Sequence, residues 1–406
     1  MTAPVALPAK LEALGRRALP FAGVALGVSV LGFLLDRDRL MGSYLFAWLF
    51  WLNVALGSMS LAMLHHLTGG AWGLALRRPL EAAARTLPYW AVLFVPIALG
   101  AHQLYPWADA EAVAGDEVLR HKAAYLNLPF FLARSVFYFA LWSLLAHSLS
   151  LWSRRHDQDG DGRFAVRMRA LSGGGLVVLG LTVTFSSIDW AMSLTPHWFS
   201  TIYGLIFMIG QALSALALTS ALVAWLHDQP PYDRAIQPRT FGDFGNLILA
   251  FTMLWGYVNL SQFLIVWSGN LAEETPFYLV REQHGWKAVG LLLVVFHFAI
   301  PFLFLLSRAR KRDPRRLFRL AAVLFAVRLV DLHYLIGPSL RAGGHGHGTH
   351  MAASALPGLL DVSLPLGLGG LWLFLWVRNL KQAPLLPMGE PEVREALGER
   401  AAEAAR

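Results

Sequence analysis

Ten long apolar stretches follow one another along the chain, separated by short segments that hold most of the charged residues. A helix needs about 20 apolar residues to cross a hydrocarbon core ~30 Å thick, and each stretch is close to that length. The stretches cover residues 18–35, 42–66, 87–104, 127–152, 170–188, 200–226, 244–268, 286–307, 317–336 and 359–378. The pattern predicts an all-α polytopic membrane protein with ten transmembrane helices.

Lysine and arginine residues indicate the orientation of these helices. If the N-terminus is cytoplasmic, 24 of them fall on the inner side, 7 fall on the outer side and 3 lie within spans. Cytoplasmic loops carry such an excess of basic residues, so both termini are predicted to be cytoplasmic. The first stretch lacks the small-residue cleavage site of a signal peptide, so it is expected to remain as a helix.

Composition excludes several classes of protein. Hydrophobic residues make up 56% of the 406 residues and charged residues only 15%, against roughly 25% in ordinary soluble proteins. A soluble enzyme is therefore excluded, and the net charge of +8 is explained by the loops rather than by a nucleic-acid site. The chain has no cysteine, so it can hold no disulfide, thiolate-bound iron–sulfur cluster or cysteine zinc site.

An internal repeat organises the spans. The sequence IDWAMSLTP (188–196) ends the fifth stretch and VDLHYLIGP (330–338) ends the ninth; in both, a proline follows the aspartate by seven residues. Four spans separate the two patterns, so the repeat preserves orientation. It predicts two four-helix bundles, spans 2–5 and 6–9, with halves at about 42–199 and 200–340 and two peripheral helices.

The first and last stretches set the bounds of the transmembrane domain, which is predicted to be residues 18–380. Residues 1–17 are a predicted cytoplasmic N-terminus. Residues 79–86 (PLEAAART) are expected to form a short helix on the inner membrane surface, because proline suits a first helical turn. The tail, 381–406, is predicted to be either a flexible end or a docking helix.

Ionisable residues at membrane depth are costly, at roughly 2.5–3.5 kcal/mol each, so they need partners or a wet cavity. His102, Arg134, Asp189, Arg328 and Asp331 are expected near the outer face, His297 near the middle and His147 toward the inner face, with His65, His66 and His227 at inner helix ends. Arg328 and Asp331 are three residues apart on one helix and can pair, whereas His333 points elsewhere. The candidates for a proton pathway are His102, Arg134, His147, Asp189, Glu273, Glu274, His297, Arg328, Asp331 and His333.

Three interpretations of these residues remain open at this point. They could be structural ion pairs that hold the bundles together, or they could form an outer and an inner half-channel that meet near His297. They could also deprotonate a quinol near the outer face, for which Asp189 with His102 or His197 is the candidate set.

Bound cofactors are not expected in this chain. No span carries two histidines at the spacing of a haem pair. The sequence 157–162 (DQDGDG) has Met168 where a calcium loop needs a glutamate, so a turn is the better interpretation. A mobile metal site at His345, His347 and His350 is a weaker alternative.

Three long motifs resemble a known family. They are LHHLTGGAWG (64–73), SIDWAMSLTPHWFSTIYG (187–204) and SQFLIVWSGNLAEETPFY (261–278). Together with ten spans, they resemble the F-type membrane subunit of bacterial alternative complex III, one of the NrfD/PsrC-like membrane proteins. The resemblance covers about residues 15–380.

The resemblance implies a function that spacing does not show. Such complexes lie in the bacterial inner membrane, oxidise menaquinol and pass electrons to cytochrome c or to a terminal oxidase. Haem c and iron–sulfur clusters lie in partner subunits, and a paralogous C subunit lies beside this one. The F-type subunit binds no cofactor; it is considered a scaffold, a possible proton conductor and, in some descriptions, a second quinone-binding subunit.

The same resemblance places individual candidate residues in motifs of the family. Asp189 lies in the DW-MSL-P motif, Glu273 and Glu274 in WSGNL-EE, Arg328 and Asp331 in R-VDL, and His297 in FHFA-P; Thr275 departs from the aliphatic residue expected there. The sequence thus predicts a non-catalytic subunit of a quinol-oxidising complex, with lipids and the other subunits as partners. A scaffold without conduction and a secondary transporter, suggested by Pro301 within span 8, remain the alternatives.

Overall fold

The computed structural model describes residues 7–160, 162–342 and 354–404. The chain is 83% helical, and the described residues form no β-strand. Ten helices or helical segments in this part of the chain are long and apolar enough to cross a membrane, which confirms the predicted all-α polytopic class.

Each of the ten spans overlaps one predicted stretch, although the first and third begin earlier, at Ala9 and Ala71 rather than at residues 18 and 87. They are α1 (Ala9–Leu35), α2 (Leu40–Thr68), α3 to α5 (Ala71–Ala84, Leu87–Val92, Val95–Leu99), α9 (Leu128–Asp159), α10 (Gly162–Trp190), α11 (Tyr203–Trp225), α13 (Pro238–Gly269), α15 to α16 (Trp286–Leu292, Ile300–Leu305), α18 (Pro314–Ala342) and α19 (Leu359–Leu380). Short helices in the connections are α6 (Ala101–Leu104), α7 (Ala110–Gly115), α8 (Glu117–Lys122), α12 (Tyr232–Ala235), α14 (Pro276–Leu279) and α17 (Arg308–Arg312), and α20 (Pro391–Ala404) follows the last span.

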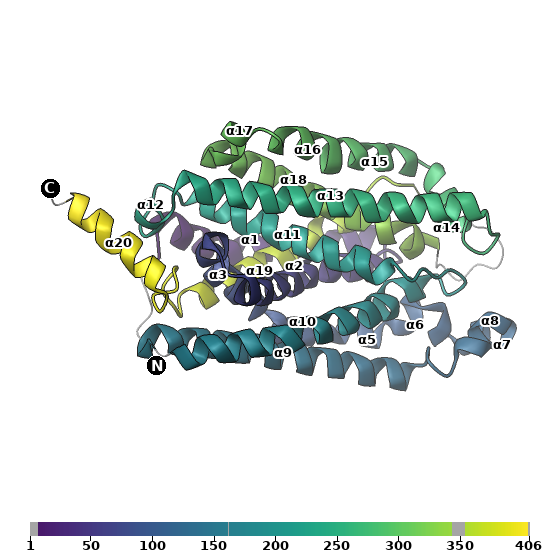
Figure 1. The fold of residues 1–406 in the computed structure, drawn as a ribbon. Helices are drawn as coiled ribbons and strands as arrows, with labels where there is room; N and C mark the ends of the chain where they lie inside the picture. The colour runs from purple at the N-terminus through teal and green to yellow at the C-terminus, as the bar shows by residue number, and fades with distance from the viewer. Residues whose placement is uncertain (1–6, 161, 343–353, 405–406) are drawn as a thin grey trace.

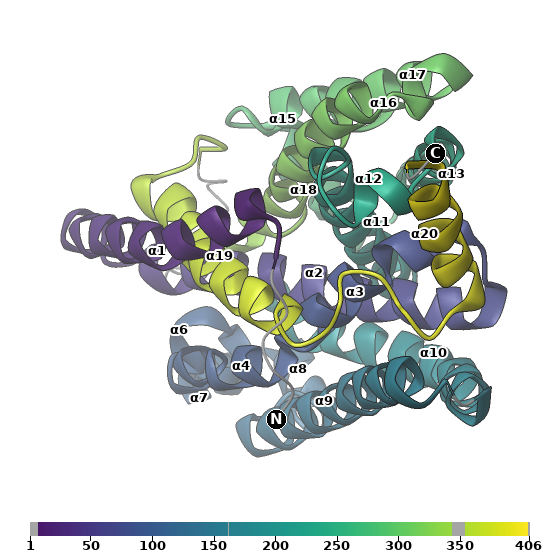
Figure 2. The same cartoon turned by 90° about the vertical axis from the view of Figure 1, so that its left-hand side faces the viewer.

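The spans assemble as two bundles. Helices α2, α3, α9 and α10 pack against one another, and α11, α13, α16 and α18 form the second group, with α10 and α2 both contacting α11. In Figure 1 the α9–α10 pair lies along one side of the molecule and the α13–α18 group along the other. Helices α1 and α19 pack together and reach the bundles through α2 (Figure 2).

Helix α2 and helix α11 form the centre of the molecule. Both are apolar around their whole circumference, as expected for helices surrounded by protein. A Cβ at Gly57 would lie 1.9 Å from the backbone oxygen of Gln211, so only glycine allows this approach. The Gln211 side chain donates to Asn53 Oδ1 over 2.9 Å and joins the two helices.

The structure corrects the prediction for residues 79–86. Pro79 lies inside α3, which begins at Ala71 after Gly69 and Gly70, two residues with positive φ. Arg78 and Glu81 on this helix are buried and bonded to each other over 2.6 Å, rather than exposed at a membrane surface. The charges are satisfied inside the protein, so the helix continues the core instead of lying on the lipid.

The C-terminal segment covers this end of the molecule. Arg77 donates to Glu390 over 2.6 Å, and Asp157 Oδ1 accepts from the backbone of Gly389 over 2.9 Å. Helix α20 then packs on α12. Of the two predicted alternatives, the docking helix is the one that the structure shows.

Candidate functional site

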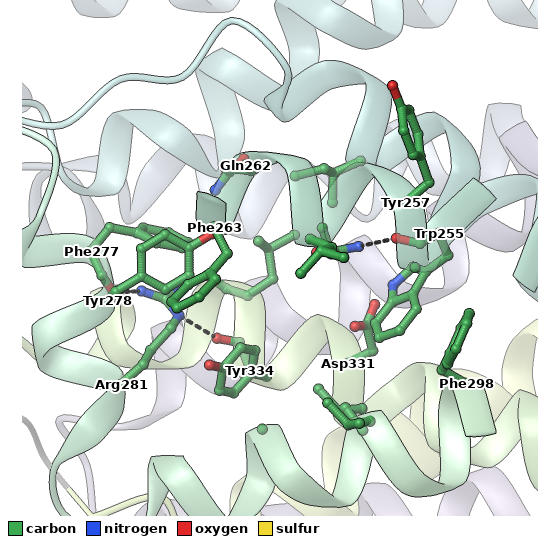
Figure 3. A pocket seen from close by; sticks show the side chains of 18 of the residues that line it. Trp255, Tyr257, Gln262, Phe263, Phe277, Tyr278, Arg281, Phe298, Asp331 and Tyr334 are labelled. Carbon is green, nitrogen blue, oxygen red and sulfur yellow. Dashed lines mark hydrogen bonds between the residues drawn. The ribbon is translucent and has the colours of Figure 1, made fainter. Parts of the chain in front are cut away.

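A cavity of about 680 Å³ opens between α13, α14, α15 and α18 of the second bundle. Its walls are mainly apolar and aromatic, and Figure 3 shows Phe263, Phe277 and Phe298 around it. One buried carboxylate, Asp331, reaches it from α18 and is 7% exposed, whereas the other lining carboxylate, Glu282, is exposed. The polar lining residues are Tyr257, Asn259, Gln262, Tyr278, Arg281, Glu282, Lys287, Asp331 and Tyr334.

Arg328 holds Asp331 at the cavity wall. The two residues are one helical turn apart on α18, and the guanidinium donates to Asp331 Oδ2. Its Nε donates to Ser214 Oγ on α11 over 3.1 Å. A Cβ at Gly210 would lie 2.1 Å from Arg328 Nη2, so glycine there makes room for the buried guanidinium. The sequence prediction that Arg328 and Asp331 pair is confirmed.

His297 completes a connected set with these two residues. It lies in a π-helical turn, Leu293–Ala299, directly before α16, where Pro301 cannot donate a backbone hydrogen bond. Its Nε2 lies 3.4 Å from Arg328 Nη1, and its ring packs on Trp255 with centroids 4.0 Å apart. Because the guanidinium can only donate, Nε2 is the acceptor, and the proton of the neutral ring is on Nδ1.

Arg281 fixes the end of the cavity that lies next to the connection between α14 and α15. It lies in the connection between α14 and α15, is buried, and donates to the backbone oxygens of Phe277, Tyr334 and Leu335 over 2.5, 3.1 and 2.6 Å (Figure 3). Burial lowers the pKa of Arg281 to about 10, so it stays charged at neutral pH. The sequence identified it only as a loop residue; its burial depends on contacts with a helix more than 50 residues away.

Asp189 occupies the matching motif of the first bundle but a different environment. It is fully buried, accepts from Arg134 Nε and Nη2 over 2.9 and 2.8 Å, and accepts from the Tyr138 hydroxyl over 2.9 Å. The Arg134 guanidinium lies between the rings of Tyr125 and Phe130. The sequence placed Arg134 and Asp189 at similar depth but did not pair them.

Several predicted pathway residues lie away from both ion pairs. His102 and His147 are on the exposed surface, as is Glu273, and Glu274 beside it is half-buried. His333 packs against the rings of Phe46 and Trp286, with centroids 5.3 and 5.1 Å away. His297, Arg328 and Asp331 are therefore the predicted residues that the structure brings together, and of the three Asp331 lines the cavity.

The residues suggested for a quinol site near Asp189 do not form one pocket. Asp189 has its carboxylate occupied by Arg134 and Tyr138, whereas His197 is an exposed side chain bonded to Asp116 over 2.6 Å. His102 is also exposed. A bidentate arginine leaves little acceptor capacity for a substrate hydroxyl.

Two residues of the predicted inner half-channel, His65 and His66, lie at the end of α2. Both are buried near Arg77, and His65 Nε2 lies 3.1 Å from the backbone oxygen of Gly70. Among the described residues, no charged side chain bonds this end of α2 to His297. The predicted sites at 345–350 lie outside the described residues.

The cavity combines one buried carboxylate, a fixed positive charge and mainly apolar walls. Such a site suits an amphipathic ligand whose hydroxyl donates to Asp331 and whose rings contact Phe277 and Phe298. Comparison with protein-family models and with curated proteins gives no match.

Proposed function

We propose that the chain is a membrane subunit of a bacterial quinol-oxidising complex similar to alternative complex III, and that it binds a quinol in the Asp331 cavity. The observation that carries the proposal is the combination of a cavity of about 680 Å³ with a single buried carboxylate on its wall. Ligand sites of this kind commonly measure about 300–1,000 Å³ and place few polar groups on apolar walls. The fused rings of menaquinol fit that description.

Asp331 is the proton acceptor in this proposal. A quinol that loses two electrons also loses two protons, so its hydroxyls need acceptors at the site. Asp331 takes a proton at its carboxylate, and Arg328 keeps its bond to Ser214 when that negative charge is lost. Asp331 passes that proton to water before it takes the second one.

Electrons leave through partner subunits in this proposal. The chain has no cysteine to hold a cluster, and quinol oxidation needs an acceptor that a partner supplies, such as haem c or an iron–sulfur cluster. The basic end of the molecule faces the cytoplasm, as the excess of arginine and lysine favours.

The test is quinol oxidation by the intact complex purified from its native membrane. Asp331→Asn removes the acceptor but keeps the shape, so we expect quinol oxidation to fall at least tenfold while the complex assembles. Glu282→Gln, on the same cavity but in the connection, is the matched control and should retain most activity.

Three outcomes would contradict the proposal. Full activity of Asp331→Asn would show that quinol is not oxidised in this cavity. A chain that purifies alone, without haem-containing partners, would contradict the role as a subunit. Proton-coupled uptake by the chain alone in vesicles would favour the transporter alternative that the interrupted span at Pro301 suggests.

A further inference from the structure

A second pocket lies at the opposite, basic end of the second bundle. It has a volume of about 370 Å³ and is formed by the start of α13 and the short helix α17. Four of its seven lining residues are basic; the lining residues are Arg239, Gly242, Asp243, Asn246, Arg308, Lys311 and Arg312. With Asp243 as the one carboxylate, the lining carries an excess of three positive charges.

Two glycines on α13 bring these charges together. A Cβ at Gly245 would lie 2.6 Å from Lys311 Cβ, and one at Gly242 would lie 3.2 Å from Arg312 Cγ. Helix α17 can therefore lie directly against α13, as Figure 1 and Figure 2 show at the end of α16. Lys311 Nζ donates to Asn246 Oδ1 over 2.5 Å and crosses the gap between the two helices.

The basic groups have few protein partners. Within the described residues, no ion pair joins Arg239, Arg308 or Arg312 to a carboxylate; Asp313 pairs with Arg316, which lies outside the pocket. The four basic residues outnumber the one carboxylate, Asp243, and repel one another, so an anion at this position would lower the electrostatic energy. The donor geometry of arginine suits phosphate oxygens in particular.

Apolar surface continues from the pocket toward the membrane interior. The last turns of α16, immediately before Ser307 and α17, expose Leu303 by 62% and Leu306 by 55%. A ligand with a phosphate group and acyl chains can therefore use both surfaces at once. A basic pocket between membrane helices on the cytoplasmic side is a typical headgroup site for anionic lipids.

We propose that the pocket formed by Arg239, Arg308, Lys311 and Arg312 binds the phosphate of an anionic phospholipid, with its acyl chains along Leu303 and Leu306. The site is separate from the Asp331 cavity and does not depend on the function proposed for that cavity. The shared chemistry is a phosphate group, which a free anion also provides, so the test compares the two sources.

The test measures lipid binding to the full-length chain, in its complex, by native mass spectrometry and by thermal stabilisation in detergent. Phosphatidylglycerol and cardiolipin are compared with phosphatidylcholine, inorganic phosphate and ATP. We expect the anionic lipids to bind and stabilise the protein, and the double variant Arg239→Gln with Arg312→Gln to bind them roughly tenfold more weakly. The matched control, Arg310→Gln with Arg315→Gln, removes the same charge outside the pocket and should bind as the unmodified protein does.

A second variant covers the case in which the double variant does not fold. Asp243→Asn removes the carboxylate that opposes the anion, so anionic lipid should bind more tightly. If both double variants weaken the binding of anionic lipid equally, the lipid responds to the overall charge of this end, and the proposed site is wrong. Equal stabilisation by inorganic phosphate or ATP, or unchanged binding in Asp243→Asn, would overturn the lipid assignment.

Discussion

The two halves of the repeat place the same aspartate in opposite environments. Asp189 in α10 is 0% exposed and accepts three hydrogen bonds, two from Arg134 and one from Tyr138. Asp331 in α18 is paired with one arginine of its own helix and lies on the wall of a cavity. One carboxylate has its acceptor capacity filled by protein, and the other keeps part of it for a ligand.

The difference comes from where the arginine is. In the first bundle Arg134 reaches across from α9, so its pair with Asp189 joins two helices. In the second bundle, Arg328 and Asp331 share α18, and the partner span contributes His297 instead. Aromatic packing differs as well: Trp48, Phe94, Phe139 and Trp142 surround Trp190 next to Asp189, where the second bundle has open volume.

A pair of this kind can therefore be structural in one copy of a repeat and functional in the other. A buried charge without its partner is strongly destabilising, whereas a charge beside a cavity that also has polar lining residues, such as Gln262 and Lys287, can be hydrated. Measuring the stability of protein variants altered in one bundle or the other tests this distinction directly.

The largest effect is expected from Arg134→Leu. This change leaves the Asp189 carboxylate buried with only Tyr138 as a donor, at a cost of about 3–5 kcal/mol in the free energy of unfolding. The measurement is thermal unfolding of the purified protein in detergent. The double variant Arg134→Leu with Asp189→Leu removes both charges and should recover most of the loss, because an apolar pair is tolerated in place of a buried ion pair.

Arg328→Leu is expected to cost less, about 1.5–3 kcal/mol, because Asp331 can be hydrated from the cavity. Its main effect should be on function, because Arg328 holds the Asp331 carboxylate at the cavity wall and keeps it charged, as a proton acceptor for quinol must be. Quinol oxidation at neutral pH should fall while the complex still assembles. If Arg328→Leu and Arg134→Leu lower stability equally, the two halves do not differ in the way proposed.

The sequence predicted the spans and one of the two ion pairs, for physical reasons. Span length follows from the thickness of the membrane, and the pairing of Arg328 with Asp331 follows from the helical repeat alone. The pairing of Arg134 with Asp189 needs the relative rotation of two helices. Both residues lie at the same end of consecutive spans, which was the one signal that could have suggested it.

The cavity itself could not be predicted from the sequence. Its walls come from side chains of α13, α14, α15 and α18, and a gap between helices depends on how all of them are packed. The position of Arg281 is the clearest example. Its three hydrogen-bond acceptors are backbone oxygens, and because every residue has one, the sequence does not indicate which of them Arg281 will contact. The predicted histidines at 102 and 147 are exposed, because hydropathy gives depth in the membrane but not the side of the helix that faces protein.

A smaller effect is expected from Tyr138→Phe. The change removes one of the three hydrogen bonds to Asp189 and keeps the ring that stacks on Trp142, so the loss should be about 1–2 kcal/mol in the free energy of unfolding. Quinol oxidation should be unchanged once stability is accounted for. A selective loss of quinol oxidation, without loss of stability, would give the first half a functional role.

The smallest effect is expected from Gly290→Ala, which should weaken ligand binding at the cavity wall without lowering the stability of the protein. A Cβ at Gly290 would lie 3.2 Å from the Tyr334 hydroxyl, so Gly290→Ala moves that side chain by a few tenths of an ångström and narrows the cavity. Alanine in a helix also gains about 0.5–1 kcal/mol over glycine, so the unfolding temperature should stay level or rise. Affinity for a fluorescent quinol analogue, titrated into the purified complex, should fall a few-fold.

Gly180→Ala in α10 is the matched control, because its Cβ would meet Met208 Sδ at an ordinary 3.7 Å. It should give the same gain in helix stability with unchanged affinity. Equal affinities for the two variants would mean that the quinol does not contact the Tyr334 wall, and the ligand would then have to lie nearer to Phe298 and Asp331.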